Sequence, residues 1–146
     1  MTAATMEMTT KTLPETARRR TNNLVWFELP VSDLIRATHF YERVFDTRLK
    51  TDERFPSLAI FPRSAEEAAT GALVQAGPES ILGASPSTDG TVIYLNCDGD
   101  LDGVLHRAQS LGAIVLQEVA QLPGGMGWIA QFRDLDGNRV GLHAIF

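Results

Sequence analysis

The sequence contains a single cysteine, Cys97, among 146 residues. One thiol cannot close an internal disulfide and cannot supply a zinc site built on cysteines. No apolar run approaches the ~20 residues that span a bilayer, and the N-terminus lacks the hydrophobic stretch of a secretory signal. These absences predict a cytoplasmic protein without membrane segments, and a composition of 44% hydrophobic and 21% charged residues is typical of one globular domain.

Basic side chains are scarce outside the first 22 residues. Residues 1–22 carry four basic and two acidic side chains, a net charge of +2. Because the whole chain has a net charge of −5, residues 23–146 carry a net charge of −7. An acidic body repels phosphate backbones, so we expect no nucleic-acid binding. Because residues 1–22 also lack any strand or helix periodicity, they are predicted to be a disordered leader.

Two successive segments of the chain have the same predicted order of elements. Residues 24–31 are strand-like and residues 35–44 repeat apolar side chains at helical spacing; residues 92–97 and a helix that opens at Asp100 repeat this order. Asp33-Leu34 and Asp100-Leu101 superimpose at an offset of 67 residues, which indicates an internal duplication. Three further short strands are expected after each helix, at residues 48–52, 57–61 and 71–75, and at residues 114–118, 127–132 and 139–144.

These elements predict an α+β domain over residues 23–146, made of two βαβββ modules at about 23–76 and 91–146. Residues 77–90 are rich in Gly, Pro and Ser and form the expected joint between the modules. Between the last two strands, Asp136-Gly137 supplies the positive φ that a tight hairpin turn needs.

On these features the chain resembles the vicinal oxygen chelate superfamily, which includes glyoxalase I, bleomycin-resistance proteins and extradiol dioxygenases. The resemblance rests on Asp33-Leu34, on the helical segment 39–45 (HFYERVF), on the paired modules, and on the segment 134–139 (DLDGNR) before the last strand. It implies that the modules form a curved, cup-like mixed sheet with helices on the convex face. It also implies that a small organic molecule binds inside the cup and that the protein is a homodimer.

Strand alternation predicts which side chains line the inside of the cup. In the first strand Val25, Phe27, Leu29 and Val31 face the helices, so Trp26 and Glu28 face inward. The same reasoning places Tyr94 and Asn96, and then Arg139 and His143, on the inside of the second module. For Trp128 both faces of its strand can pack, and its direction stays open.

Metal-dependent relatives imply ligand positions that this chain fills with unsuitable residues. The resemblance places those positions at Trp26, Val92 and Gly141, and less securely at Gly71, and none of these side chains binds a metal. His39 and His106 lie on predicted helices, which leaves His143, with Glu28 as its one carboxylate companion. We therefore expect no metal cofactor.

Glu28 and His143 are the candidate catalytic residues, because a carboxylate flanked by Trp26 and Phe27 is suited to proton transfer and an imidazole can shuttle a proton or hold an oxygen. The alternatives are that Glu28 pairs with Arg139 or Asn96 and that His143 is structural. The candidate ligand-binding residues supply aromatic walls, an amide and a guanidinium: Trp26, Tyr94, Trp128, Asn96 and Arg139. The alternatives are core packing for the aromatic rings and a strand-end turn for Asn96.

Three functions remain open on the sequence. The first is a glyoxalase-like small-molecule-binding protein, or a metal-independent lyase or isomerase that works by proton transfer. The second is sequestration of a cationic compound of the bleomycin-resistance kind, which the −7 charge of the body favours. The third is a metal-dependent lyase or dioxygenase.

Overall fold

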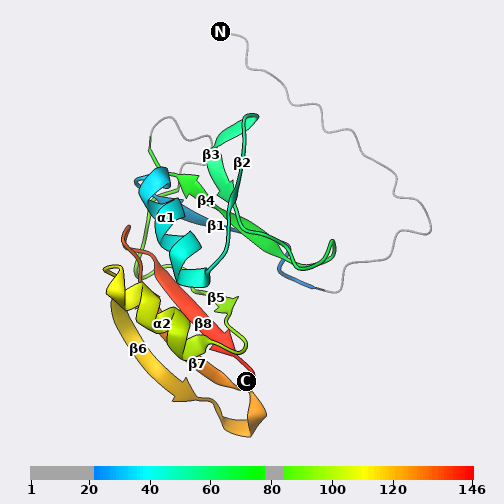
Figure 1. Cartoon of the computed structure of the whole chain (residues 1–146), viewed down its shortest axis with the longest axis vertical. Coiled ribbons are helices and arrows are strands. Elements are labelled where there is room, and N and C mark those ends of the chain that lie inside the picture. The colour runs from blue at the N-terminus through cyan, green and yellow to red at the C-terminus, as the bar shows by residue number, and fades with distance from the viewer. Residues whose placement is uncertain (1–21, 78–83) are drawn as a thin grey trace, which may run out of the picture.

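The computed structural model describes residues 22–77 and 84–146, so the predicted leader lies outside the described residues except for Asn22. Two modules follow one another along the chain (Figure 1). The elements of the first are β1 (Trp26–Val31), α1 (Leu34–Phe45), β2 (Lys50–Asp52), β3 (Phe55–Ile60) and β4 (Thr70–Gln75). Those of the second are β5 (Ile93–Asn96), α2 (Leu101–Ser110), β6 (Ile114–Gln121), the 3₁₀ turn η1 (Pro123–Gly125), β7 (Trp128–Arg133) and β8 (Arg139–Ala144). Among the described residues, neither α1 nor α2 has the length and hydropathy of a membrane-spanning helix.

Each module forms its own four-stranded mixed sheet, and the two sheets have the same strand order. The orders are β1-β4-β3-β2 and β5-β8-β7-β6, with a parallel first pair and antiparallel neighbours thereafter. The α+β class and the paired βαβββ modules are therefore confirmed. The offset of 67 residues also holds, because α1 begins at Leu34 and α2 at Leu101.

Local sequence signals explain where α1 begins and ends. The Asp33 side chain accepts a hydrogen bond from the Arg36 backbone N–H at 3.0 Å, which satisfies one of the unpaired donors of the first turn. At the other end Asp46 adopts the left-handed conformation (φ 48°, ψ 55°) that commonly terminates a helix. Between these caps, the apolar residues that recur at helical spacing are buried: Ala37, Phe40, Tyr41 and Val44.

Both helices cover one face of the sheets, and the side chains between them form a single hydrophobic core. In β1, Leu29 and Val31 are buried in this core while Trp26 and Glu28 are exposed on the other face. In β8, Val140, Leu142 and Ala144 are buried in the same way. The predicted alternation is thus confirmed in both of these strands.

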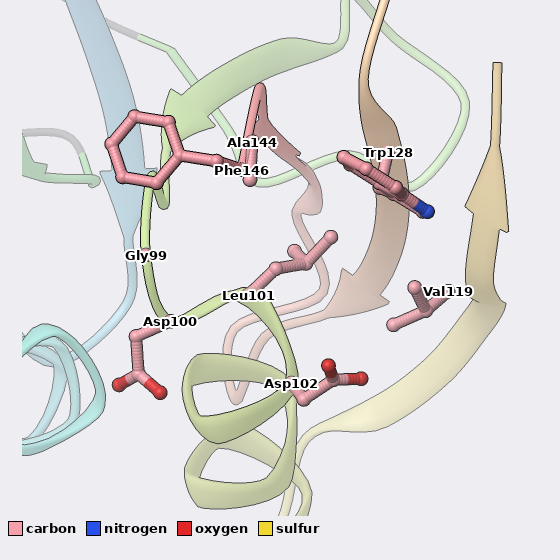
Figure 2. A pocket seen from close by; sticks show the side chains of 8 residues that line it. All are labelled: Gly99, Asp100, Leu101, Asp102, Val119, Trp128, Ala144 and Phe146. Carbon is pink, nitrogen blue, oxygen red and sulfur yellow. The ribbon is translucent and has the colours of Figure 1, made fainter.

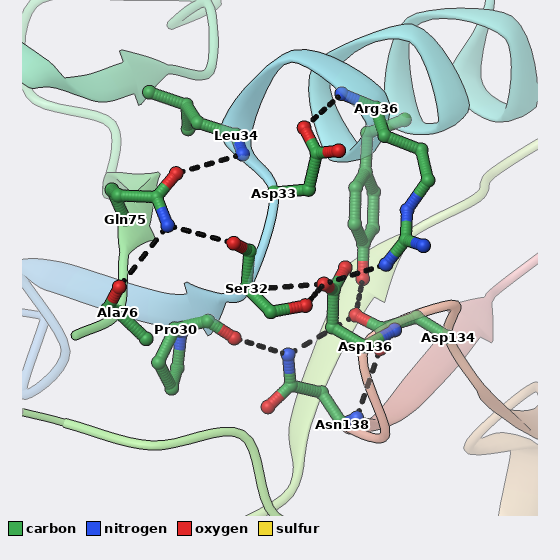
Figure 3. Close-up of polar contacts among 11 residues, drawn as sticks. Pro30, Ser32, Asp33, Leu34, Arg36, Gln75, Ala76, Asp134, Asp136 and Asn138 are labelled. Carbon is green, nitrogen blue, oxygen red and sulfur yellow. Dashed lines mark hydrogen bonds and ion pairs between the residues drawn. The ribbon is translucent and has the colours of Figure 1, made fainter.

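A buried polar network joins the turn between β7 and β8 to the first module (Figure 3). The Asn138 side-chain amide donates to the Pro30 carbonyl at 2.7 Å, and the Asp136 carboxylate accepts from the Ser32 hydroxyl at 2.6 Å. Asp136 also pairs with the Arg36 guanidinium at 3.1 Å. Gly137 has φ +101°, as the tight turn requires. The network fixes the turn, and therefore the start of β8, relative to β1.

Beneath this turn, the fully buried Tyr41 hydroxyl donates to the Asp134 carboxylate at 2.6 Å. Burial raises the pKa of Tyr41 well above its usual value, and the adjacent Asp134 charge raises it further. Asp134 also accepts from the backbone N–H groups of Asp136 and Asn138, both at 2.9 Å. The phenol therefore stays protonated and ties α1 to the second module.

Candidate functional site

The helix-free face of the second sheet brings together most of the predicted site residues. Register and alternation place the following side chains on one surface, here called the inner face of the C-terminal sheet: Tyr94 and Asn96 from β5, Arg139, Gly141 and His143 from β8, and Ile129, Gln131 and Arg133 from β7. Tyr94 lies directly beside Gly141 in the parallel β5–β8 pair, and Gln131 lies on the other side of Gly141. The middle strand β8 therefore has no side chain at Gly141, between the polar groups of Tyr94 and Gln131.

The Tyr94 ring lies over Gly141. A Cβ atom added at Gly141 would lie 2.6 Å from a ring carbon of Tyr94, which is closer than real Cβ atoms approach other heavy atoms. The Tyr94 ring can therefore occupy this position only because residue 141 is glycine. Tyr94 nevertheless keeps 45% of its surface exposed. The ring is a flat aromatic surface that is open to a ligand.

A polar chain runs along the edge of the ring from Arg139 through Gln131 to Tyr94. The Arg139 guanidinium donates to the Gln131 side-chain carbonyl at 2.8 Å, and the Gln131 amide group donates to the Tyr94 hydroxyl at 2.6 Å. Arg139 is held in turn by the Thr88 carbonyl at 3.0 Å, in the joint between the modules. The joint thus contributes to the site.

His143 and Asn96 occupy the far end of the inner face. His143 Nε2 lies 2.7 Å from the Met126 carbonyl. Because a carbonyl oxygen only accepts, Nε2 carries the proton and the Nδ1 lone pair remains for another partner when the ring is neutral. The Asn96 side-chain oxygen accepts from the Asp98 backbone N–H at 2.9 Å, so the strand-end turn that was the alternative for Asn96 is present.

Glu28 and Trp26 lie on the helix-free face of the other sheet, and both side chains are exposed. Among residues 22–77 and 84–146, no hydrogen bond or ion pair joins Glu28 to Arg139, Asn96 or His143. The alternative pairing of Glu28 is therefore not formed within this part of the chain. The proposed catalytic pair of Glu28 and His143 is not brought into contact either.

Trp128 lies on the opposite face of its strand from Gln131. It alternates with Ala130 and Phe132, both fully buried in the helix-covered core. Figure 2 shows its indole beside Val119 and the first turn of α2, at a pocket of about 300 Å³ that also includes Leu101 and Ala144. The expectation that Trp128 walls the same cleft as Tyr94 does not fit this position.

The family's metal positions do not fit a metal in this chain. Tyr94 fills the space above Gly141, and Gly71 lies on the helix-covered face, where an added Cβ would meet the Phe27 ring at 2.5 Å. Gly71, the less secure of the positions implied by the resemblance, therefore does not face the inside of the cup. In the described part of the chain, no group of three or more His, Cys, Asp or Glu side chains is placed to hold a metal ion.

Cys97 follows β5 and is buried in the helix-covered core. Burial raises the pKa of its thiol to about 12, so little thiolate exists at neutral pH. A buried thiol that stays protonated at neutral pH is a poor nucleophile.

Charge on the inner face of the C-terminal sheet is opposite to that of the chain as a whole. Among the residues of β5, β7 and β8 named above, Arg133 and Arg139 are charged and none is a carboxylate, whereas the neighbouring edge strand β6 carries Glu118. The net charge of −5 therefore did not indicate the local charge. Sequence reasoning also missed Gln131, although its alternation with the buried Ala130 and Phe132 was the signal that could have identified it.

Comparison with known proteins identifies relatives of this fold. A family model described as the Glyoxalase/Bleomycin resistance protein/Dioxygenase superfamily matches residues 23–142. No match is found among curated proteins.

Three solved structures illustrate the likeness. TnmS3, an antibiotic binding protein from Streptomyces sp. CB03234, is 27% identical with a TM-score of 0.60, covering 87% of this chain and 98% of its own. A glyoxalase/bleomycin resistance protein from Albidiferax ferrireducens T118 is 16% identical with a TM-score of 0.67, covering 83% and 97%. The fosfomycin resistance protein FosX from Listeria monocytogenes is 19% identical with a TM-score of 0.59, covering 84% and 93%. The last two show the shared fold alone.

Proposed function

Because the chain belongs to the glyoxalase/bleomycin resistance protein/dioxygenase superfamily, we propose that it binds a small organic molecule on the inner face of its C-terminal sheet, without a metal at the family's positions. The observation that carries this proposal is the Tyr94 ring on Gly141 with the Arg139–Gln131 pair at its edge. An exposed aromatic plane beside a few fixed polar groups is the usual composition of a ligand site.

The relatives support binding as the function. TnmS3 is described as an antibiotic binding protein, and it covers 87% of this chain at 27% identity. Transfer of that role to this chain predicts saturable capture of a planar compound without turnover.

The local charge decides which compounds fit best. The two arginines that β7 and β8 present on the inner face disfavour a cation beside them and attract an anion or a carbonyl oxygen. Sequestration of a cationic compound, favoured by the overall charge of the body, is therefore the weaker form of the proposal.

A metal-independent lyase or isomerase is the second candidate function. It rests on His143, whose Nε2 is held by the Met126 carbonyl and whose Nδ1 can accept a proton. Glu28 lies on the other sheet and makes no contact with His143, so this candidate function assigns the proton transfer to His143 without Glu28. The expected homodimer and cytoplasmic location stay predictions.

Binding can be tested by following backbone resonances of ¹⁵N-labelled protein during titration with 2-naphthoate, a planar anion. We expect saturable shifts for residues of β5, β7 and β8, and a loss of affinity of at least tenfold in Tyr94→Ala. Trp128→Phe, on the opposite face, is the matched control and should bind as the unaltered protein does. Shifts centred on the α2 side of the sheet, or unchanged affinity in Tyr94→Ala, would refute this location.

Mass spectrometry of the natively purified protein addresses binding without a chosen probe. A small molecule that co-purifies and is retained without chemical change supports the binding role. Its conversion to a product during incubation, abolished in His143→Ala, would instead support the lyase or isomerase.

A further inference from the structure

We infer that the Arg139–Gln131–Tyr94 chain selects ligands that present a hydrogen-bond acceptor, such as a ketone or carboxylate oxygen, over ligands that present a donor. This inference rests on the proposed function and deepens it by naming the chemical class of the ligand. It follows from the direction in which each hydrogen bond of the chain must run.

The first link fixes the orientation of the Gln131 amide. A guanidinium has five N–H donors and no acceptor, so the atom 2.8 Å from Arg139 Nη1 must be the Gln131 oxygen. A flipped amide would place two donors against each other. The Gln131 nitrogen therefore points toward Tyr94.

The second link fixes the role of the Tyr94 hydroxyl. Its oxygen lies 2.6 Å from the Gln131 nitrogen and must accept, because that nitrogen only donates. The hydroxyl proton cannot be used in this bond, and no acceptor for it exists among the described residues. The proton is therefore available to a ligand atom that accepts.

The arrangement of donors at this edge strengthens the preference. Arg139 uses one N–H toward Gln131 and another toward the Thr88 carbonyl, which leaves three N–H groups for other partners. Hydrogen bonds in a chain polarise one another, so donation from Gln131 makes the Tyr94 hydroxyl a better donor. A ligand that rests on the Tyr94 ring thus meets donors on either side of the Gln131 amide.

Three probes with the same naphthalene ring differ in charge and in hydrogen-bond direction, and the two acceptors among them differ in charge alone. They are 2-acetonaphthone, a neutral acceptor; 2-naphthoate, an anionic acceptor; and 2-naphthylmethylammonium, a cationic donor. We expect the neutral ketone and the carboxylate to bind about tenfold or more tightly than the ammonium, the ratio that one well-placed hydrogen bond supplies. The neutral ketone is the decisive probe, because simple attraction to the arginines does not explain its binding.

Two variants test the direction of the chain. In Gln131→Glu the carboxylate accepts from both Arg139 and the Tyr94 hydroxyl, which removes the free proton, so affinity for 2-acetonaphthone should fall about tenfold. Tyr94→Phe keeps the ring and removes the hydroxyl, with the same expected loss. Because both changes remove one proton, Gln131→Glu should cost little more in the Tyr94→Phe background. Trp128→Phe is again the control.

The outcomes separate the two proposals. If none of the three probes shifts the resonances of the inner face at millimolar concentration, the proposed function itself is refuted. If all three bind there with equal affinity, or if Gln131→Glu leaves the affinity for 2-acetonaphthone unchanged, the ligand site stands and the acceptor preference is overturned. Thermal melts of each variant establish that a loss of binding does not come from unfolding, since Gln131 and Tyr94 both lie at the surface of the sheet.

Discussion

Replacement of Tyr41 by phenylalanine removes one hydroxyl from the centre of the polar network and leaves the aromatic packing in place. The hydroxyl is fully buried and bonds the Asp134 carboxylate at 2.6 Å. A hydrogen bond to a charged group contributes about 1.5–3 kcal/mol. Asp134 keeps three other donors, from the Asp136 and Asn138 backbones and the Asn138 side chain, so it is not left unsatisfied. We therefore expect Tyr41→Phe to lower the free energy of unfolding by about 2 kcal/mol, toward the middle of that range.

The same variant has a pH signature. The pKa of Tyr41 is raised in the folded protein, so above the unfolded value near 10 the folded state binds the additional proton. The contribution of Tyr41 to the free energy of unfolding is fully present below pH 10 and decreases by about 1.4 kcal/mol per pH unit above pH 10. Tyr41→Phe should lose stability more slowly than the unaltered protein between pH 10 and 12.

Urea unfolding followed by circular dichroism measures both effects. In a thermal melt at pH 7 the same cost corresponds to a fall in melting temperature of about 6 °C for a chain of this size. Tyr94→Phe is the matched control, because its hydroxyl is at the surface and its loss should change stability by less than ~0.5 kcal/mol. Equal stabilities of Tyr41→Phe and the unaltered protein at pH 7, or parallel losses above pH 10, would refute this account of the network.

Two further predictions concern the inner face and the core. Gly141→Ala should reduce 2-naphthoate affinity at least tenfold while changing the free energy of unfolding by less than ~1 kcal/mol, because the new Cβ displaces the exposed Tyr94 ring rather than buried atoms. A ligand titration and a urea unfolding curve on the same preparation check both values. Unaltered affinity would contradict the role of the ring. Cys97, with a thiol pKa of about 12, should react with iodoacetamide at pH 8 only as fast as the protein opens, and a reaction rate independent of added urea would count against its burial.

Much of the fold followed from local pattern. The periods of the apolar residues and the Asp136-Gly137 turn each act over a few neighbours, so they predict helices, strands and turns without tertiary information. Alternation likewise placed Tyr94, Arg139 and His143 on one face, because successive side chains in a strand point to opposite sides.

The site depended on contacts between strands that are distant in the sequence. Only the β7–β8 register brought Gln131 beside Gly141, and only the packing of Ala130 and Phe132 against the helices decided that Trp128 faces away from the ligand surface. Periodicity cannot choose a face when both sides of a strand can pack. The sequence by itself therefore determined the two-module architecture and most of the residues that face inward. Tertiary structure decided which of them meet, because a hydrogen bond needs two atoms within about 3 Å and pairing across strands is set by register.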